Sequence, residues 1–307
     1  MINKYSSDFM AKMIGKLLGD GCITKQNGRK PRFYFSHTIR DKEWAIYCHN
    51  QLKQDIPLND AKYRKITDNR LVQSYSERYE ILSRTDNIIT LLENKWYENR
   101  IKKVPFTLLE KYFNTISLAW WYQDDGSLKL KNNIPRKIIL STECFTPEEN
   151  IKLVLLLKRL YQLEFSLDKQ NRLIIYTASQ IHYFLSLVQP YLQPCMFRKN
   201  IQLTKLMYIP NGSRRTTIHL PSHFTLHKPT QDINKSLEKL TIIINLYKNE
   251  KFYPTIYNKF WEEQKNIPAK KTYQIVITET NLSLLYHLKE LTGFNFSQLC
   301  HFAFWIK

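Results

Sequence analysis

Two stretches of this chain end in the same way, and they constrain its fold more than any other feature. Residues 13–21 read Met-Ile-Gly-Lys-Leu-Leu-Gly-Asp-Gly, and residues 118–126 read Leu-Ala-Trp-Trp-Tyr-Gln-Asp-Asp-Gly. Each is an apolar helical run that stops at an acid followed by glycine, the residue that most readily adopts the left-handed conformation at a helix end. We therefore expect Asp20 and Asp125 in the last turns of two helices, with their carboxylates directed out of the helix ends.

Two such ends brought together would hold two carboxylates close to one another. Like-charge repulsion would then keep one acid protonated unless a cation lay between them. A divalent metal suits this position, because Mg²⁺ prefers oxygen ligands and both helix C-termini carry partial negative charge. Asp20 and Asp125 are thus candidate Mg²⁺ ligands, and two ordinary capped core helices are the alternative.

The segments after the two acids follow one plan, which indicates an internal repeat. The spacing between Asp20 and Asp125 is 105 residues, and a repeat within one chain implies pseudo-twofold symmetry. In the first copy, a helix ending near Gly19 is followed by expected strands at about 22–26 and 30–37, a helix at 41–53, strands at 61–66 and 71–75, and a helix at 85–97. In the second copy, a helix at about 115–124 is followed by strands at 127–131 and 136–142, a helix at 147–161, strands at 165–169 and 172–176, and a helix at 178–188.

The paired acid-glycine stretches resemble the two motifs of a single-chain LAGLIDADG homing endonuclease, over roughly residues 8–205. The resemblance implies an α+β fold in which two pseudo-symmetric αββαββα units pack through their motif helices, with a C-terminal accessory extension. The expected domains are residues 1–104, 105–210 and 211–307. It also implies a metal-dependent enzyme that cuts both strands of a long asymmetric DNA site and leaves 3′ overhangs.

The resemblance further implies one basic residue near each metal, and matching points to Lys102 and Arg198. A solvated linker lysine is the alternative for Lys102, and arginine at 198 departs from the pattern if lysine is required there. Trp120 and Trp121 stand where the family name would place Gly and Leu. We interpret them as core residues filling a groove over Gly15 and Gly19, which lie four apart on one helix face.

The net charge points to a polyanionic partner. The chain carries 46 Lys+Arg against 27 Asp+Glu, a formal net charge of +19, which favours nucleic acid. No run approaches the roughly 20 apolar residues of a membrane span, so no membrane partner is expected.

Five scattered cysteines without a C-x-x-C pair indicate reduced thiols. The Ile-, Lys- and Asn-rich composition is typical of an AT-rich genome, so we expect the protein in the organelle that encodes it (mitochondrion or chloroplast), or else in a bacterial cytoplasm. The resemblance to a single-chain enzyme implies a monomer.

Alternating polar positions in the expected hairpins could face double-stranded DNA. In residues 30–37 the polar side chains alternate with apolar ones, which leaves one basic face and one face that can be buried. Such a face could read the major groove, and a solvated sheet face is the alternative. The candidate DNA contacts are Lys25, Arg32, Tyr34, Lys62, Arg64, Arg70, Lys129, Lys131, Arg136 and Lys137.

The last third lies outside the resemblance. Residues 210–215 read as a linker, followed by an expected helix at about 232–247, an irregular Tyr- and Lys-rich stretch, a strand at 273–278, a helix at 281–291 and another from about 297. The order strand, helix, helix faintly resembles a ribbon-helix-helix DNA-binding module. An accessory bundle is the alternative.

Three functions remain open from the sequence. A homing endonuclease accounts for both acids and the charge. An RNA maturase that assists splicing of its intron RNA would need the basic surface without the metals. A non-catalytic DNA-binding regulator would be expected to have lost an acid, and both are present.

Overall fold

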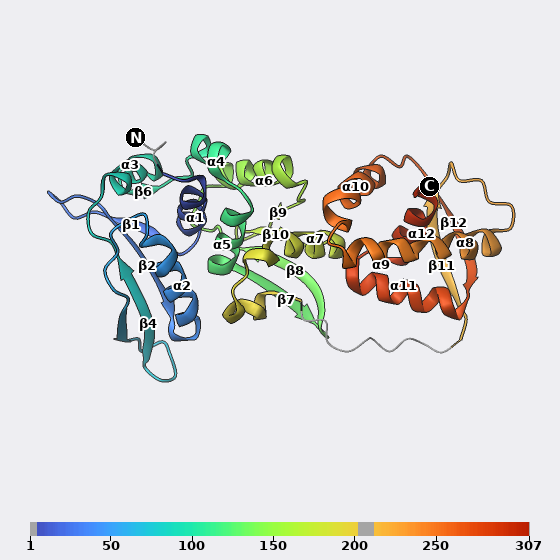
Figure 1. Cartoon of the computed structure of the whole chain (residues 1–307), viewed down its shortest axis with the longest axis horizontal. Helices are drawn as coiled ribbons and strands as arrows, with labels where there is room; N and C mark the ends of the chain where they lie inside the picture. The colour runs from blue at the N-terminus through green and yellow to red at the C-terminus, as the bar shows by residue number, and fades with distance from the viewer. Residues whose placement is uncertain (1–4, 202–211, 307) are drawn as a thin grey trace. The chain divides into compact units, whose positions relative to one another are not determined.

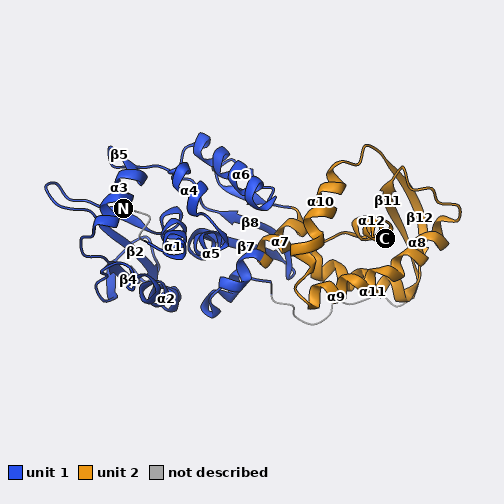
Figure 2. Cartoon of the chain, turned by 45° about the horizontal axis from the view of Figure 1, so that its top comes forward, with its two compact units in different colours: residues 1–176, 187–201 blue, residues 177–186, 202–307 orange. Residues whose placement is uncertain are grey.

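The computed structural model describes residues 5–201 and 212–306 and divides the chain into two compact units (Figure 2). Unit 1 comprises residues 1–176 and 187–201, and unit 2 comprises residues 177–186 and 202–307. The expected boundary at 210 lies outside the described residues, and the three-domain division stays a prediction.

Unit 1 contains the expected repeat (Figure 1). The first copy consists of α1 (Ser7–Leu18), β1 (Cys22–Thr24), β2 (Arg32–Thr38), α2 (Lys42–Leu52), β3 (Lys62–Thr67), β4 (Tyr75–Leu82) and α3 (Asn87–Trp96). The second consists of α5 (Thr115–Asp125), β7 (Gly126–Lys131), β8 (Ile134–Leu140), α6 (Pro147–Tyr161), β9 (Ser166–Leu167), β10 (Leu173–Ile175) and α7 (Ala178–Val188). Of these elements, only α7 lies mostly in unit 2. The αββαββα order predicted for each copy is confirmed.

Shorter elements join and follow the two copies. They are η2 (Ile39–Asp41), β5 (Tyr97–Glu98), β6 (Ile101–Lys102), α4 (Phe106–Tyr112), η3 (Gln189–Tyr191) and η4 (Pro194–Lys199). The elements β5, β6 and α4 were not predicted, because each is too short to show a clear periodic pattern.

The two four-stranded sheets have the same strand order, β1-β2-β4-β3 and β7-β8-β10-β9. Alternation in β2 buries Phe33 and Phe35 and leaves Arg32 exposed, as period-2 patterning requires. Asn132 and Asn133, between β7 and β8, have φ values of 52° and 59°. Two successive positive values are those of the type I′ turn that favours hairpins.

The predicted strand at 71–75 is wrong. The strand is β4, which begins at Tyr75, and Val72 lies fully exposed in the preceding loop. The Asp68 N–H donates to the Ser74 carbonyl, and Ser74 has a φ of 58°. The loop is therefore longer than the four-residue turn expected, and the apolar pair Leu71-Val72 was mistaken for the start of a strand.

The helices α1 and α5 pack closely because small residues of one meet large residues of the other. A Cβ added to Gly15 would lie 2.6 Å from Trp120 Cβ, and one added to Gly19 would lie 2.5 Å from Asp124 Cβ. Trp120 and Trp121 are buried. The predicted packing of a tryptophan over a glycine is confirmed for Trp120 at Gly15, whereas Gly19 meets Asp124. Both tryptophans are core residues, as predicted.

Unit 2 is built on a two-stranded antiparallel ribbon of β11 (Arg214–Pro221) and β12 (Lys270–Ile277). Its helices are α8 (Pro229–Leu237), α9 (Thr241–Lys248), α10 (Asn258–Lys265), α11 (Glu279–Thr292) and α12 (Phe296–Trp305), with η5 (Glu238–Leu240) and the π-turn η6 (Phe252–Tyr257). The strand and the two final helices expected from the sequence are confirmed. Two expectations are corrected: Arg214 and Arg215 belong to β11 and not to a linker, and η5 divides the helix expected at 232–247.

Within residues 5–201 and 212–306, every helix is too short or too polar to pass through a bilayer.

Candidate active site at the ends of the motif helices

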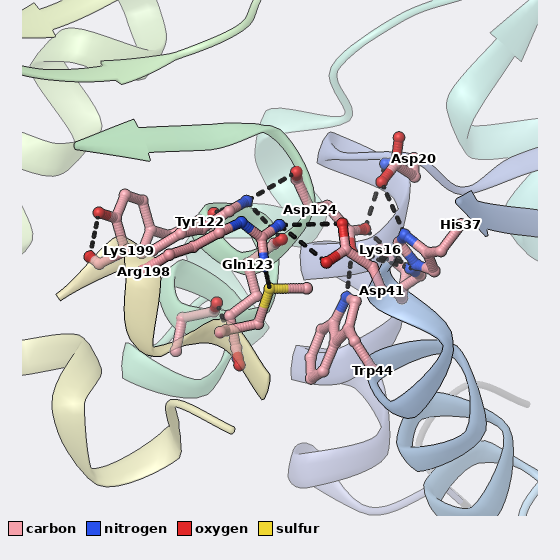
Figure 3. A network of polar contacts seen from close by, with 12 residues as sticks. Lys16, Asp20, His37, Asp41, Trp44, Tyr122, Gln123, Asp124, Arg198 and Lys199 are labelled. Carbon is pink, nitrogen blue, oxygen red and sulfur yellow. Dashed lines mark hydrogen bonds and ion pairs between the residues drawn. The ribbon is translucent and has the colours of Figure 1, made fainter. Parts of the chain in front are cut away.

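The site forms where α1 and α5 end side by side (Figure 3). Asn114 caps the start of α5 by accepting hydrogen bonds from the Ile116 and Ser117 amides, and Ser6 caps α1 by accepting from the Phe9 amide. Asp125 is the last residue of α5, and Asp20 follows α1 by two residues. The sequence therefore placed both acids correctly at helix ends.

The reason for the glycines differs from the one expected. Gly21 and Gly126 do not have positive φ values. An added Cβ would lie 2.6 Å from the Lys16 carbonyl oxygen at Gly21 and 2.0 Å from Tyr122 Cδ2 at Gly126. Glycine is needed because the chain leaves each helix against the last turn, where a side chain does not fit.

Burial and neighbouring carboxylates raise the pKa values of both Asp20 and Asp125. Burial raises the pKa of Asp125 to about 7, and the charges of Asp20 and Asp124 add to the rise. Burial likewise raises the pKa of Asp20 to about 6, with the charge of Asp124 as the next cause. Three acids thus share one partly buried region, where each negative charge makes ionisation of its neighbours less favourable.

Asp124, which was not predicted as a site residue, joins the two helices, and both of its carboxylate oxygens accept hydrogen bonds. Its Oδ1 accepts hydrogen bonds from Lys16 Nζ at 2.9 Å and from Trp44 Nε1 at 2.7 Å. Its Oδ2 accepts from the Asp20 amide at 3.1 Å and lies 2.9 Å from Lys16 Nζ. Burial alone would lower the pKa of Lys16, but the charge and hydrogen bond of Asp124, together with the charges of Cys48 and Asp20, outweigh burial, so the pKa is raised. This buried ion pair fixes the end of α1 to the last turn of α5.

His37 connects this ion pair to Asp20. Lys16 Nζ lies 2.9 Å from His37 Nε2, and His37 Nδ1 lies 3.2 Å from Asp20 Oδ2. Burial, reinforced by the Lys16 charge, lowers the pKa of His37 to about 3, so the ring is neutral. Because Lys16 donates to Nε2, the ring proton is on Nδ1 and is donated to the Asp20 carboxylate. His37 therefore orients one of the two predicted ligands.

The donor set suits a divalent cation. Ligand atoms of Asp20, His37 and Asp124 lie within 4.8 Å of one another, but His37 Nε2 and both Asp124 oxygens already accept protein donors. Asp20 and Asp125 are the acids whose pKa values are raised, first by burial and then by the charges of neighbouring carboxylates. Oxygen ligands of this kind fit Mg²⁺.

A lysine lies at the end of each motif helix. Lys102 Nζ donates to the Gly21 carbonyl at 2.9 Å, and Lys199 Nζ donates to the carbonyls of Tyr122, Gln123 and Asp124 at 3.1, 2.6 and 3.0 Å. Burial lowers the pKa of Lys102, and it lowers that of Lys199 to about 8. Lys102 is therefore not a solvated linker lysine, because its ammonium group is held near Asp125.

The structure does not bring Arg198 to the helix ends. Its guanidinium pairs with Asp41 at 2.8 Å and also donates to the Cys195 carbonyl. The neighbouring residue, Lys199, has the position that Arg198 was expected to occupy. Arg198 and Lys199 are adjacent in η4 but have different partners, which spacing alone does not reveal.

The candidate DNA contacts of the first copy lie mostly on one sheet face. Cross-strand pairing puts Arg32 and Tyr34 on the face of β2 opposite to buried Phe33 and Phe35. Lys62 and Arg64 pair with Glu80 and Arg78 of β4, whose neighbours on β2 share that exposed face.

Three further candidates differ from these: two residues of the first copy form ion pairs, and one residue of the second copy lies at a register shift of its sheet. Lys25 lies 3.6 Å from Glu93, and Arg70 pairs with Asp68 in the loop before β4. The β7–β8 register shifts after Lys129, which leaves Arg136 outside the cross-strand pairs.

The remaining candidates lie on the second sheet. Lys129 and Lys137 are direct cross-strand partners, and Lys131 pairs with Ile134 near the hairpin tip. Two lysines opposite one another repel, so this pair favours an anion on that face.

Several residues of the site were missed from the sequence. The signals were present in part: Asp124 is an acid directly beside Asp125, and Lys16 is a charged residue inside an apolar run. His37 and Trp44 gave no such signal, because only the fold brings them to the helix ends.

Comparison with known proteins agrees with this geometry. The sequence model of the LAGLIDADG DNA endonuclease family matches residues 10–184. An uncharacterized protein of Methanocaldococcus jannaschii, MJ1098, is 32% identical over 203 residues, which are 63% of this chain and 73% of that protein. The intron-encoded endonuclease ai4 of Dictyostelium discoideum is 24% identical over 157 residues, 50% of this chain and 91% of that protein.

A solved structure shares the fold. The homing endonuclease I-WcaI bound to its DNA recognition sequence superposes with a TM-score of 0.55 at 20% identity, covering 64% of this chain and 88% of that one. The family match spans more than half of the sequence and includes both acid-glycine motifs. This chain is therefore a member of the LAGLIDADG homing endonuclease family.

Proposed function

We propose that this protein is a catalytically competent homing endonuclease that makes a Mg²⁺-dependent double-strand break at a long, asymmetric DNA site and leaves 3′ overhangs. The observation that carries the proposal is that Asp20 and Asp125 lie at the adjoining ends of α1 and α5, where the Asp20 amide donates to the carboxylate of Asp124, the residue before Asp125. Two acids near a pseudo-twofold axis suit the cutting of two strands. Two non-identical copies in one chain suit an asymmetric site and a monomeric enzyme.

Asp20 and Asp125 would hold the metal as ionised ligands. A bound Mg²⁺ would supply a water of lowered pKa and neutralise charge at the scissile phosphate. Because metal-bound carboxylates are ionised, neither acid would act as the general base. The hydrogen bond from His37 Nδ1 would keep one Asp20 oxygen occupied, which directs the other toward the metal.

Lys102 and Lys199 would stabilise negative charge that develops on the phosphate. Both ammonium groups are anchored by backbone carbonyls at the helix ends. Preorganised cations in a partly buried site stabilise charge more strongly than they do in water. Lys199 would act through its charge, because its three N–H groups already donate to the carbonyls of Tyr122, Gln123 and Asp124.

The exposed faces of the two sheets would bind the duplex on either side of the acids. Arg32, Lys62 and Arg64 on the first sheet and Lys129 and Lys137 on the second supply donors for phosphates and base edges. Several such contacts make affinity fall steeply as salt rises. The intron-encoded relative supports a gene carried within an intron.

The test is a cleavage assay on DNA that spans the uninterrupted insertion site of the gene. We expect one double-strand cut in Mg²⁺ and none after chelation. Binding without cutting in Mg²⁺ would favour the non-catalytic regulator. Rescue of precursor-RNA splicing in the absence of cutting would favour the RNA maturase.

A further inference from the structure

Unit 2 contains a surface that the endonuclease core does not explain. Its ribbon pairs β11 and β12 antiparallel over eight residue pairs, from Arg214↔Ile277 to Pro221↔Lys270. One face is apolar and covered: Ile218, Leu220, Ile275 and Ile277 are almost fully buried, with α8 and α12 packed against the strands. The other face is exposed.

The exposed face is polar and basic. Pairing places Arg215 beside Val276, Thr217 beside Gln274, and His219 beside Thr272. The exposed members are Arg215, Thr217, His219, Lys270, Thr272, Gln274 and one apolar residue, Val276. Two basic side chains, Arg215 and Lys270, lie on this face, whereas the register places Arg214 and Lys271 on the other side of the ribbon. Neither strand contains an acidic residue. A face of this charge complements a polyanion and repels basic partners.

The edges of the ribbon are closed to a further strand. Ser297 Oγ accepts from the His219 amide on the β11 side. On the β12 side, Asn234 donates to the Val276 carbonyl and accepts from the Thr278 amide. Side chains that occupy edge groups in this way discourage strand addition, so the ligand must approach the face and not the edge.

We propose that the β11–β12 ribbon is a second DNA-binding element, which inserts its exposed face into the major groove of duplex DNA. This inference rests on the proposed function in one respect only, namely that the proposed function makes duplex DNA the ligand. The major groove is about 12 Å wide and accommodates a two-stranded ribbon. Strands lie about 4.8 Å apart, which leaves room for one layer of side chains on each side.

The side chains match the groups displayed in that groove. Gln274 can bond adenine in a bidentate manner, Arg215 can do the same to guanine, and the Thr217 methyl can contact the thymine methyl. The Gln274 and Arg215 side chains make no hydrogen bond to any residue described in the structure, so their donors are available. His219 Nδ1 lies 3.0 Å from Thr272 Oγ1, which holds both side chains on the face. A hollow of about 550 Å³ beside them, lined by Thr217, Lys270 and the first turn of α12, makes the surface concave.

The test compares three variants of the full chain on a long duplex centred on the insertion site. The first removes base-reading groups without changing charge, Thr217→Ala with Gln274→Ala. The second removes the two basic charges of the exposed face, Arg215→Gln with Lys270→Gln. The matched control removes two exposed charges elsewhere in unit 2, Lys248→Gln with Lys251→Gln. All six side chains are exposed, and thermal unfolding should match the parent.

Footprinting, affinity and salt dependence distinguish the outcomes. We expect the first variant to lose protection on one flank of the footprint and to lose about tenfold in affinity. The second should lower the slope of log affinity against log salt by about 2, and the control should lower it less. Both ribbon variants should still cut at saturating protein concentration.

Equal footprints for the ribbon variants and the control would overturn the proposal, as would a defect confined to RNA binding. The inference is separable from the endonuclease proposal. A parent that fails to cut but loses a flank of its footprint when the ribbon is changed would refute cleavage and support the ribbon.

Discussion

Lys16 and Asp124 form an ion pair across the two motif helices, with 2.9 Å between Lys16 Nζ and Asp124 Oδ2 and both side chains fully buried. The pair lies where the LAGLIDADG name would place leucine and alanine. Breaking a buried pair leaves an uncompensated charge, whereas replacing both members with apolar residues is often close to neutral.

We therefore predict that Lys16→Leu destabilises unit 1 by about 3–5 kcal/mol, because Asp124 is left charged and buried. The double variant Lys16→Leu with Asp124→Ala should recover much of the loss, although the Trp44 indole and the Asp20 amide lose an acceptor. Denaturant unfolding of both single variants and the double variant gives the coupling energy. Additive losses would contradict a direct pair.

Gly15 and Gly19 test the close approach of α1 and α5. Gly19→Ala would bring a Cβ to 2.5 Å from Asp124 Cβ, and overpacking of this kind costs typically 1–3 kcal/mol or more. Gly28 is the control, because an added Cβ meets nothing within 4 Å and only its φ of +68° is unfavourable. Thermal unfolding should show a larger loss for Gly19→Ala than for Gly28→Ala, and the reverse order would contradict the packing.

Lys199 and Arg198 are adjacent but should differ in effect. Lys199→Met removes the cation that contacts three carbonyls at the end of α5, and we expect single-turnover cleavage to fall about 100-fold or more. Arg198→Met removes the pair with Asp41 and should lower the rate much less. Measured DNA affinity serves as the control for both. Equal rate losses would show that position 199 has no special role.

Unit 2 should lose stability in acid. Burial lowers the pKa of His182 and of His301 to about 4, below the usual value near 6.5. The unfolded state therefore binds more protons than the folded state between these values, so stability is full above about pH 6.5 and falls as pH decreases toward 4. Thermal unfolding across this range should show the fall, and it should be smaller in His182→Phe. A pH-independent midpoint would contradict the burial of these imidazoles.

The features that depend on local sequence pattern and on the internal repeat were predicted from the sequence. The motif helices, the order of elements in both copies and the burial of Trp120 and Trp121 follow from apolar periodicity, caps and turn residues. The strand β4 was misplaced because Leu71 and Val72 are apolar residues in an exposed loop. The strand β11 was hidden because its first residues, Arg214 and Arg215, look like linker charge.

The site was predictable at the acids and less so around them. Asp20 and Asp125 are marked by the glycines that follow, whereas the contacts of Lys16, His37 and Trp44 depend on tertiary packing. Arg198 and Lys199 are both basic, and only the turn of η4 determines which one contacts the end of α5.

The most direct measurement is cleavage and binding of the insertion-site duplex by Asp125→Asn and Asp20→Asn, each with and without Mg²⁺. Amides keep the size of the side chain but are poorer metal ligands, so cutting should be lost in each variant while duplex binding in the absence of metal stays near that of the parent. Replacing Asp124, whose oxygens are held by protein donors, should act mainly on stability. Parent-like, Mg²⁺-dependent cutting by both Asp125→Asn and Asp20→Asn would contradict the assignment of the metal to these two acids.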